Sequence, residues 1–344
     1  MANEPLRLGL VSCGEIALKH QKAIDGVDEA EVVACMDIHE PVARDMAERC
    51  DCPCFTDLGA LVAEDAVEAV LISTPHYLHA PQTIQAARAG KHVMVEKPIA
   101  TTEEDATAMI RECRQAGVRL KTIFPQRYQR SVVKARELIR AGVIGDVRLL
   151  TLFSIGHKED SYWRGGFTGR VTTDWRRSKE KAGGGFLIMN FVHNIDCMRF
   201  VTGLEAETVY ADYDTFATPV EVEDAIVATV RYENGALGAI VGTTFAAGGG
   251  VRSDVIIGTR GQIEMGNPLR VYLSEPAEGM AANEWLELPC ERIDARGESV
   301  REFAEAVRAG RDPDITGEDG RSALRVCLAA YEAGAAKAPV RVPA

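Results

Sequence analysis

The sequence has 344 residues, which is more than one compact domain usually needs and enough for two. Hydrophobic residues make up 46% and charged residues 26% of it, so the chain can bury large cores and is unlike a disordered protein. The 39 Lys and Arg against 51 Asp and Glu give a net charge of −12, which argues against binding of nucleic acid or an anionic membrane.

The sequence shows no basic start followed by an apolar run and no stretch of about 18 apolar residues, so we expect a cytoplasmic protein without a membrane span. Its nine cysteines are an odd number, which favours reduced thiols. Cys50, Cys52 and Cys54 alternate, whereas a zinc site usually combines two separated pairs of ligands. The alternation instead predicts one face of a short buried strand, and we expect no metal.

The first third of the chain alternates short apolar strands with helices. The patterns predict strands at 6–12, 31–36, 69–73, 92–95 and 118–123, and helices at 16–24, 41–49, 80–89 and 103–116. The strands are apolar on both faces, which is typical of a parallel sheet covered by helices on each side. We therefore expect a doubly wound α/β domain over residues 1–123.

The pattern then changes to longer, alternating strands. We expect helices at 131–141, 298–309 and 318–337, and strands at 146–155, 206–215, 222–232, 235–245, 252–257 and 261–265. Asn234-Gly235 is the two-residue turn of a hairpin. The pattern predicts an α+β domain over residues 124–344 with an open, mainly antiparallel sheet; whether the last helix packs back on the first domain is left open. The uncovered sheet face predicts a homodimer or homotetramer.

The turn after the first strand, residues 12–17, reads Ser-Cys-Gly-Glu-Ile-Ala. A dinucleotide fingerprint has the pattern G-x-G-x-x-G/A here, because glycine permits a tight turn and lets the pyrophosphate approach a helix N-terminus. Ser12 stands at the first glycine and Gly14 at the second; an ordinary strand–turn–helix is the alternative. Asp37 ends the second strand, where an acid binds the adenosine ribose and repels a 2′-phosphate, which favours NAD over NADP.

Two further motifs carry groups suited to proton transfer. Lys97 follows the fourth strand in Glu-Lys-Pro, at the sheet edge where ligands bind, and can stabilise an alkoxide; a solvent-facing turn lysine is the alternative. Three glycines at 183–185 open a helix that carries Asn190, His193 and Asp196 near one face. A histidine can exchange a proton near neutral pH, although a lone histidine is more often a core residue.

The segment between Gly156 and Arg177 is polar and aromatic. It contains His157, Asp160, Tyr162, Trp163 and Arg164. Flat aromatic faces with hydrogen-bonding groups suit a sugar ring. A subunit contact explains the same composition equally well.

On these residues the chain resembles the Gfo/Idh/MocA family of glucose–fructose oxidoreductases and inositol dehydrogenases nearly end to end. The resembling segments are the first turn, 71–75 with His79, 90–98, 126–128, 142–146, 174–176, 183–196 and 258–261. The Glu-Lys-Pro motif, after a helix ending in Ala-Gly-Lys-His, is quite specific. The resemblance implies a Rossmann domain followed by an open-sheet domain.

The resemblance also implies roles for individual residues. Lys97 and His193 would form the catalytic pair, the lysine orienting the substrate and the histidine acting as general acid/base. Cofactor contacts would come from Ser12, Cys13, Gly14, Glu15, Ile16, Asp37, Ser73, Thr74, Pro75, His79, Glu96, Lys97, Gln126, Trp175 and Arg176. Substrate contacts would come from Lys97, Tyr162, Trp163, Arg176, Asn190 and His193. Many members have an aspartate four residues before the histidine, where this chain has Met189.

Together, the residues and the resemblance predict an NAD(P)-dependent oxidoreductase, with NADP the less favoured cofactor. It would transfer a hydride between nicotinamide and a secondary hydroxyl or carbonyl of a sugar, glycoside or inositol-like polyol. Two alternatives are a nucleotide-binding regulator without turnover, and a redox-neutral lyase or glycosidase that reduces and reoxidises its NAD within one turnover.

Overall fold

The computed structural model describes residues 4–166 and 168–343, which form two compact units. Unit 1 comprises Met1–Pro125, Glu159–Gly184 and Asp294–Leu324, and unit 2 comprises Gln126–Lys158, Gly185–Ile293 and Arg325–Ala344. The predicted boundary at residue 123 lies near the end of the first segment of unit 1, which also includes two later segments of the chain. Within the described ranges, no helix combines the length and the hydropathy needed to cross a membrane.

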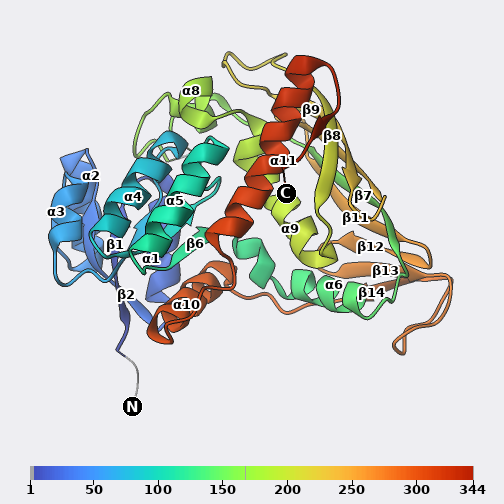
Figure 1. The fold of residues 1–344 in the computed structure, drawn as a ribbon, viewed down its shortest axis with the longest axis horizontal. Coiled ribbons are helices and arrows are strands. Elements are labelled where there is room, and N and C mark those ends of the chain that lie inside the picture. Colours follow the sequence, from blue (N-terminus) through green and yellow to red (C-terminus); the bar gives the residue numbers. More distant parts are fainter. Residues whose placement is uncertain (1–3, 167, 344) are drawn as a thin grey trace. The chain divides into compact units, whose positions relative to one another are not determined.

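Unit 1 contains a six-stranded sheet in the order β3-β2-β1-β4-β5-β6, and every neighbouring pair is parallel, as predicted. Figure 1 labels β1, β2 and β6 of this sheet. The strands are β1 (Leu6–Val11), β2 (Ala30–Met36), β3 (Cys54–Phe55), β4 (Ala69–Ile72), β5 (His92–Glu96) and β6 (Leu120–Ile123). The strand order changes direction between β1 and β4. In sheets of this kind, ligands bind beyond the carboxyl ends of the strands at that point.

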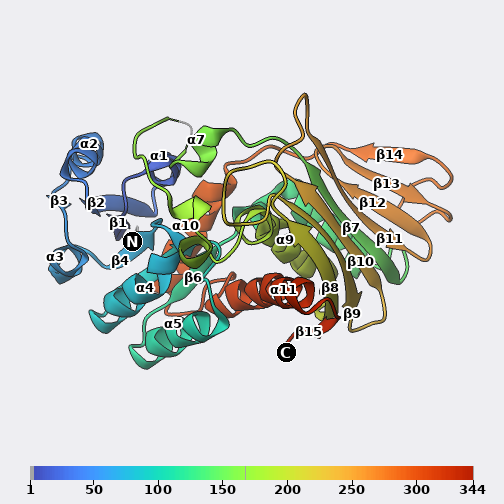
Figure 2. The same cartoon turned by 90° about the horizontal axis from the view of Figure 1, so that it is seen from above.

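Helices cover both faces of the parallel sheet (Figure 2). The longer ones are α1 (Glu15–Asp25), α2 (Glu40–Cys50), α3 (Leu58–Ala63), α4 (His79–Arg88), α5 (Glu103–Gln115) and α10 (Ala295–Arg308). On one face, Leu8 and Leu10 of β1 join Met46 of α2 and Phe303 of α10 in a buried core. On the other face, Gly9 leaves room for α3, because a β carbon there would lie 2.8 Å from the Leu61 side chain.

Unit 2 contains a nine-stranded sheet in the order β14-β13-β12-β11-β7-β10-β9-β8-β15 (Figure 2). Its strands are β7 (Val147–Ile155), β8 (Ala206–Asp214), β9 (Ala225–Tyr232), β10 (Leu237–Thr243), β11 (Val251–Gly258), β12 (Gly261–Met265), β13 (Leu269–Leu273), β14 (Trp285–Leu288) and β15 (Val340–Arg341). Only β10 and β7 pair in parallel among these strands, so the predicted mainly antiparallel sheet is confirmed. The short strands β13, β14 and β15 were not predicted, and β3 begins at the last of the three cysteines for which a strand was predicted.

The predicted hairpin turn at Asn234-Gly235 joins β9 to β10. The Gly235 N–H donates to the Tyr232 carbonyl at 2.8 Å, and Gly235 has φ of 81°, a conformation that glycine adopts without strain. Helices α6 (Arg130–Arg140) and α9 (Val192–Thr202) pack against each other and contact the sheet at β12 and β7 respectively. The long helix α11 (Gly317–Ala336) begins in unit 1 and ends in unit 2.

The prediction for the three alternating cysteines is wrong in its secondary structure. Cys50 is the last residue of α2, Cys54 lies on β3, and Cys52 lies in the turn that joins them. All three nevertheless pack against the apolar core of unit 1. Helix α2 continues to Cys50 and ends there because the next residue, Asp51, adopts a left-handed conformation with φ of 49°.

Candidate functional site

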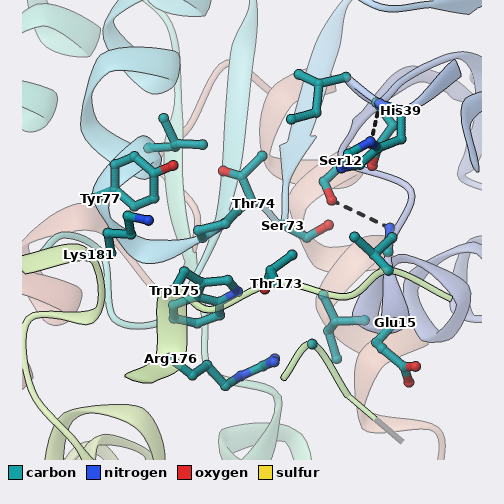
Figure 3. A pocket seen from close by; sticks show the side chains of 18 of the residues that line it. Ser12, Glu15, His39, Ser73, Thr74, Tyr77, Thr173, Trp175, Arg176 and Lys181 are labelled. Atoms are coloured by element: carbon teal, nitrogen blue, oxygen red, sulfur yellow. Dashed lines mark hydrogen bonds between the residues drawn. The ribbon is translucent and has the colours of Figure 1, made fainter. Parts of the chain in front are cut away.

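A pocket of unit 1 opens beyond the carboxyl ends of β1, β2 and β4 (Figure 3). Three turns after these strands form part of the lining, and the segment 159–184 forms the rest. The lining residues are Ser12, Gly14, Glu15, Ile16, Met36, Asp37, Ile38, His39, Ser73, Thr74, Pro75, Tyr77, Leu78, Gln82, Gly165, Val171, Thr173, Asp174, Trp175, Arg176 and Lys181. They include most of the residues predicted to contact a cofactor.

The turn after β1 has the backbone of a glycine-rich loop. Ser12 has φ of 80°, which explains why the dinucleotide fingerprint asks for glycine at this position. The Gly14 N–H donates to the Ser12 hydroxyl at 3.4 Å, and Gly14 is the N-cap of α1 without a side-chain hydrogen bond. A β carbon on Gly14 would meet only that hydroxyl, at 3.7 Å. The space in front of the α1 N-terminus is therefore open, which suits an anionic group.

Asp37 follows β2 and its side chain is 6% exposed. Its Oδ2 accepts from the Cys13 N–H and its Oδ1 from the His39 N–H, both at 2.9 Å. Each carboxylate oxygen can accept more than one hydrogen bond, so both can still bind ribose hydroxyls. The Cys13 side chain is fully buried, so this residue can reach the pocket only through its backbone.

An aromatic and cationic wall closes the other side of the pocket (Figure 3). The Arg176 guanidinium lies 4.6 Å from the ring centre of Trp175 and 5.0 Å from that of Tyr162. The Trp175 ring in turn meets His76 edge to face, with centroids 4.5 Å apart. Burial lowers the pKa of Arg176, and it lowers that of His76 well below its usual value. His76 therefore packs against the Trp175 ring as a neutral imidazole.

Thr168 and Arg170, which precede Trp175 and Arg176 in the chain, form hydrogen bonds and an ion pair with the turn after β1 and with helices α1 and α2. Arg170 donates from Nε to the Cys13 carbonyl at 2.7 Å and from a terminal nitrogen to the Val42 carbonyl at 3.2 Å, and it pairs with Asp45 at 2.5 Å. The Thr168 N–H donates to the Glu15 carboxylate at 2.7 Å. These contacts hold the segment against the loop that would bind a pyrophosphate.

Lys97 follows β5, at the same edge of the sheet as the pocket, and is partly buried. Glu96 precedes it, and its carboxylate accepts from the Lys97 N–H at 3.1 Å and contacts Nε2 of buried His20 at 2.8 Å. The peptide bond between Lys97 and Pro98 is cis. These neighbours fix the backbone from which the lysine side chain extends.

His79 differs from its predicted role as a cofactor contact. Its side chain is fully buried, and its two ring nitrogens lie 2.8 Å from the Pro98 carbonyl and 2.9 Å from the Thr74 carbonyl. Burial lowers its pKa. The imidazole therefore links the turns after β4 and β5, and its effect on a ligand would be indirect.

A second cavity lies in unit 2 and contains Asn190 and His193. These residues come from a π-helical turn, Leu187–Phe191, and from α9, which follows it directly. Such turns often occur at functional sites. The cavity residues are Gln126, Ser154, Gly156, His157, Lys158, Phe186, Asn190, Phe191, His193, Asn194, Thr243, Thr244 and Arg252. Gln126, predicted at the cofactor, lies here.

The start of the His193 helix is held by Glu223. Its Oε2 accepts from the Gly185 N–H at 2.6 Å, its Oε1 from the Leu187 N–H at 2.9 Å, and its backbone carbonyl from the Phe186 N–H at 3.1 Å. Tyr331 of α11 donates to the same carboxylate at 2.8 Å. Burial raises the pKa of Glu223. A β carbon on Gly185 would lie 2.1 Å from the Glu223 carbonyl oxygen, so this close contact requires glycine.

Asp196 does not join Asn190 and His193 in the cavity, contrary to the predicted common face. Its side chain is 1% exposed and forms a two-pronged ion pair with Arg127, at 2.8 and 2.5 Å. His193 and Asp196 both lie on the regular helix α9, but Asp196 is almost one turn further along it, where Arg127 binds its carboxylate. Met189, at the place of the family's aspartate, is 2% exposed and belongs to the core.

Trp163 is a further correction. The sequence analysis assigned it to a sugar-binding surface, but its side chain is 1% exposed and packs edge to face with Tyr162 at 5.2 Å. Sequence reasoning also missed lining residues. Tyr77, Gln82, Thr173 and Lys181 line the first pocket, and Lys158, Thr243, Thr244 and Arg252 line the second cavity. Lys158 and Thr173 fall in the segment between Gly156 and Arg177 that the sequence analysis described as polar and aromatic, but they were not singled out there. The others lie outside the motifs, so the sequence carries no local signal for them.

Comparison with known proteins adds an independent line of support. A family model described as "Oxidoreductase family, NAD-binding Rossmann fold" matches residues 6–124, and the model of the GFO/IDH/MocA C-terminal domain matches residues 132–264. The myo-inositol 2-dehydrogenase of Thermotoga maritima is 28% identical over 98% of each chain. The 1,5-anhydro-D-fructose reductase of Ensifer adhaerens is 31% identical over 81% of each chain.

Solved structures share the fold over the full length. The WlbA dehydrogenase from Bordetella pertussis, crystallised with NADH and UDP-GlcNAcA, has a TM-score of 0.85 at 27% identity and covers 99% of each chain. A levoglucosan dehydrogenase in complex with NADH has a TM-score of 0.87 at 23% identity, which is a likeness of fold.

Proposed function

Because this chain belongs to the GFO/IDH/MocA family of NAD-binding Rossmann-fold oxidoreductases, we propose that it transfers a hydride between NAD and a sugar, glycoside or inositol-like polyol. The reacting group would be a secondary hydroxyl or the corresponding carbonyl. The observation that carries the proposal is the pocket of unit 1, where an open glycine turn and Asp37 lie at the edge of the sheet that Lys97 also occupies.

The residues of the pocket fit a dinucleotide. The open N-terminus of α1 offers backbone N–H groups to the pyrophosphate, and Asp37 offers acceptors to the adenosine ribose. A carboxylate at that place repels a 2′-phosphate, which supports NAD over NADP. Trp175 and Arg176 would lie near the nicotinamide or the substrate.

The proposed chemistry divides between Lys97 and His193. When bound, NAD would supply the acceptor for the hydride that leaves the substrate carbon. His193 would take the proton of the reacting hydroxyl, and the Lys97 ammonium would stabilise the negative charge that develops on its oxygen. Reduction would use the same groups in the opposite direction. Asn190 lines the same cavity as His193 and can hydrogen-bond a substrate hydroxyl.

We also propose that the protein forms a homodimer or homotetramer through the sheet of unit 2. Val227 and Leu237 point outward from neighbouring strands β9 and β10 and are 57% and 47% exposed. Such apolar residues on an open sheet favour burial against a second copy. A monomeric mass in light scattering at micromolar concentration would contradict this.

The test of the proposed function is a screen of sugars, glycosides and inositols with NAD and with NADP, followed by the absorbance of NADH at 340 nm. Lys97→Ala and His193→Ala are each expected to lower kcat about 10²–10⁴-fold on the best substrate. His193→Ala is expected to keep NADH binding, measured by NADH fluorescence, and kcat of Lys97→Ala is measured at saturating NAD because this lysine is also an expected cofactor contact. Lys134→Ala, on the exposed face of α6, serves as the control and is expected to match the unchanged protein.

Two outcomes would contradict the proposal. Substrate consumption detected by mass spectrometry without net NADH would indicate a redox-neutral reaction. Tight NADH binding without conversion of any substrate, together with unchanged binding in both variants, would indicate a regulator.

A further inference from the structure

The described residues that line the cavity around His193 include cations and no carboxylate, although the chain as a whole is acidic. Lys158 and Arg252 bring two cationic side chains to it, and His157 and His193 add two imidazoles. Among the described residues that line it, none is aspartate or glutamate. In a protein with a net charge of −12, such a concentration of positive charge requires an explanation.

Arg252 is held at the cavity by strand pairing rather than by a strong ion pair. It lies on β11 opposite Ser154 of β7, which also lines the cavity. Asp254 is the nearest carboxylate, but its Oδ2 is 3.8 Å from the arginine Nε, and the same oxygen accepts a 2.6 Å hydrogen bond from Asn194. Arg252 keeps 57% of its side chain exposed. Its charge is therefore only partly compensated within the protein.

Lys158 reaches the cavity from the chain segment that follows β7. Its N–H donates to the Thr244 carbonyl at 2.7 Å, so the backbone is fixed where the side chain begins. The Thr243, Thr244 and Asn190 side chains add hydroxyl and amide groups. The cavity thus combines two cations with neutral polar groups, next to the proposed general base.

This composition suits an anion better than a neutral polyol. A guanidinium matches the two oxygens of a carboxylate or phosphate, and hydrogen bonds to charged groups are stronger than those between neutral groups. Carboxylate side chains, which accept hydrogen bonds from sugar hydroxyls, do not line this cavity among its described residues.

We propose that Arg252 and Lys158 bind an anionic group of the substrate, so that the enzyme acts on a sugar or polyol that carries a carboxylate or a phosphate. The inference rests on the proposed function and narrows its substrate class. The two cations act as specificity residues, while hydride and proton transfer remain with the groups already assigned.

The first experiment compares matched substrates in the 340 nm assay. The pairs are glucuronate with glucose, gluconate with glucitol, and glucose 6-phosphate with glucose. We expect kcat/KM to be roughly tenfold to hundredfold higher for the anionic member of at least one pair. The carboxylate and phosphate arms distinguish the two kinds of anion. Equal or better turnover of every neutral member would overturn the inference while leaving the proposed function intact.

Variants then assign the effect to residues. Arg252→Gln and Lys158→Gln are each expected to raise KM for the anionic substrate roughly tenfold or more, with a smaller change in kcat, and to leave neutral substrates unaffected. Arg148→Gln is the matched control, because it removes a half-exposed arginine from β7 of the same sheet, outside the cavity. An equal loss on charged and neutral substrates in the two cavity variants would overturn the inference.

A binding measurement separates this inference from the proposed function. Thermal unfolding is followed with glucuronate and with glucose 6-phosphate, with and without NADH. We expect one of the two to raise Tm in the unchanged protein and in Arg148→Gln, but not in Arg252→Gln. If no substrate is turned over but this pattern holds, the anion site stands and the oxidoreductase proposal fails. If neither anion raises Tm and no anionic substrate is preferred, the anion site is rejected.

Discussion

The pocket of unit 1 and the cavity of unit 2 are built by different means. The first is formed by backbone turns at the ends of parallel strands, and its features are a left-handed Ser12 and an open Gly14. The second is formed around a helix whose start is fixed by the buried carboxyl group of Glu223 and whose middle is held by the buried Asp196–Arg127 pair. From this comparison we expect substitutions in the turn to change the free energy of unfolding little. Substitutions of the groups that bind the buried carboxyls are expected to lower it more. Three predictions test this difference.

The largest effect is expected from Arg127→Ala. It leaves the Asp196 carboxylate, 1% exposed, without the guanidinium that binds both of its oxygens, which typically costs about 3–5 kcal/mol of unfolding free energy. Urea unfolding followed by circular dichroism measures the loss. The double variant Arg127→Met/Asp196→Leu is expected to recover more than half of it, and exposed Arg130→Ala to change little. A loss below about 1 kcal/mol would show that the buried pair is dispensable.

Glu223→Ala is expected to have an intermediate effect of about 1–3 kcal/mol at acid pH, because it leaves the N–H groups of Gly185 and Leu187 without their side-chain acceptor. The loss depends on pH. Burial raises the pKa of Glu223, so its contribution to stability is full below its usual value of 4.5 and is lost as the pH rises through the raised value. The stability gap between the two proteins is therefore expected to narrow from acid to neutral pH.

The check on this prediction is a series of urea titrations between pH 4 and pH 8 on both proteins. Exposed Glu233→Ala, ten residues later in the chain, is the control and is expected to change the free energy of unfolding by less than about 0.5 kcal/mol. A gap that widens towards neutral pH would mean that the carboxylate is stabilised by its hydrogen bonds more than it is destabilised by burial.

The smallest effect is expected from Ser12→Gly in the first turn. Glycine removes the cost of the left-handed conformation, about 1–2 kcal/mol, but adds about 0.5–1 kcal/mol of chain entropy, so a net gain of about 0.5–1 kcal/mol is expected. Ser12→Ala keeps the strain and removes the hydroxyl that Gly14 contacts. If both variants have a lower free energy of unfolding than the original protein, by equal amounts, the hydrogen bond of the Ser12 hydroxyl contributes more than the left-handed conformation costs.

The sequence was most informative where function depends on a few neighbouring residues. Local patterns predicted the parallel sheet, the turn that contains Ser12 and Gly14, and Asp37 at the end of β2. Ser12, Gly14 and Asp37 line one pocket in the structure. Patterns of this kind reflect backbone conformations that only certain residues adopt. The hairpin at Asn234-Gly235 was predictable for the same reason.

The cavity around His193 was less predictable. The three-residue spacing placed Asp196 near His193, but it gave no sign that Arg127, 69 residues earlier in the chain, binds the Asp196 carboxylate. Burial also overrode residue type for Trp163 and His79, whose side chains suggested ligand contacts and proved to be packed inside. Arg252 joins the cavity only through the pairing of β11 with β7, which is a long-range contact.

Tyr331 also bears on how the protein is made. Its hydroxyl meets the Glu223 carboxylate and accepts from the Ile188 N–H, 143 residues earlier in the chain. During synthesis, at about 5–20 residues per second, roughly 7–30 s pass between the emergence of these two partners. During that interval, the glycine-rich start of the helix that carries His193 lacks the hydrogen bonds that Tyr331 makes to Ile188 and Glu223. A nascent chain cut short before α11 would therefore lack the Tyr331 hydroxyl, which bonds both to the Glu223 carboxylate and to the Ile188 N–H.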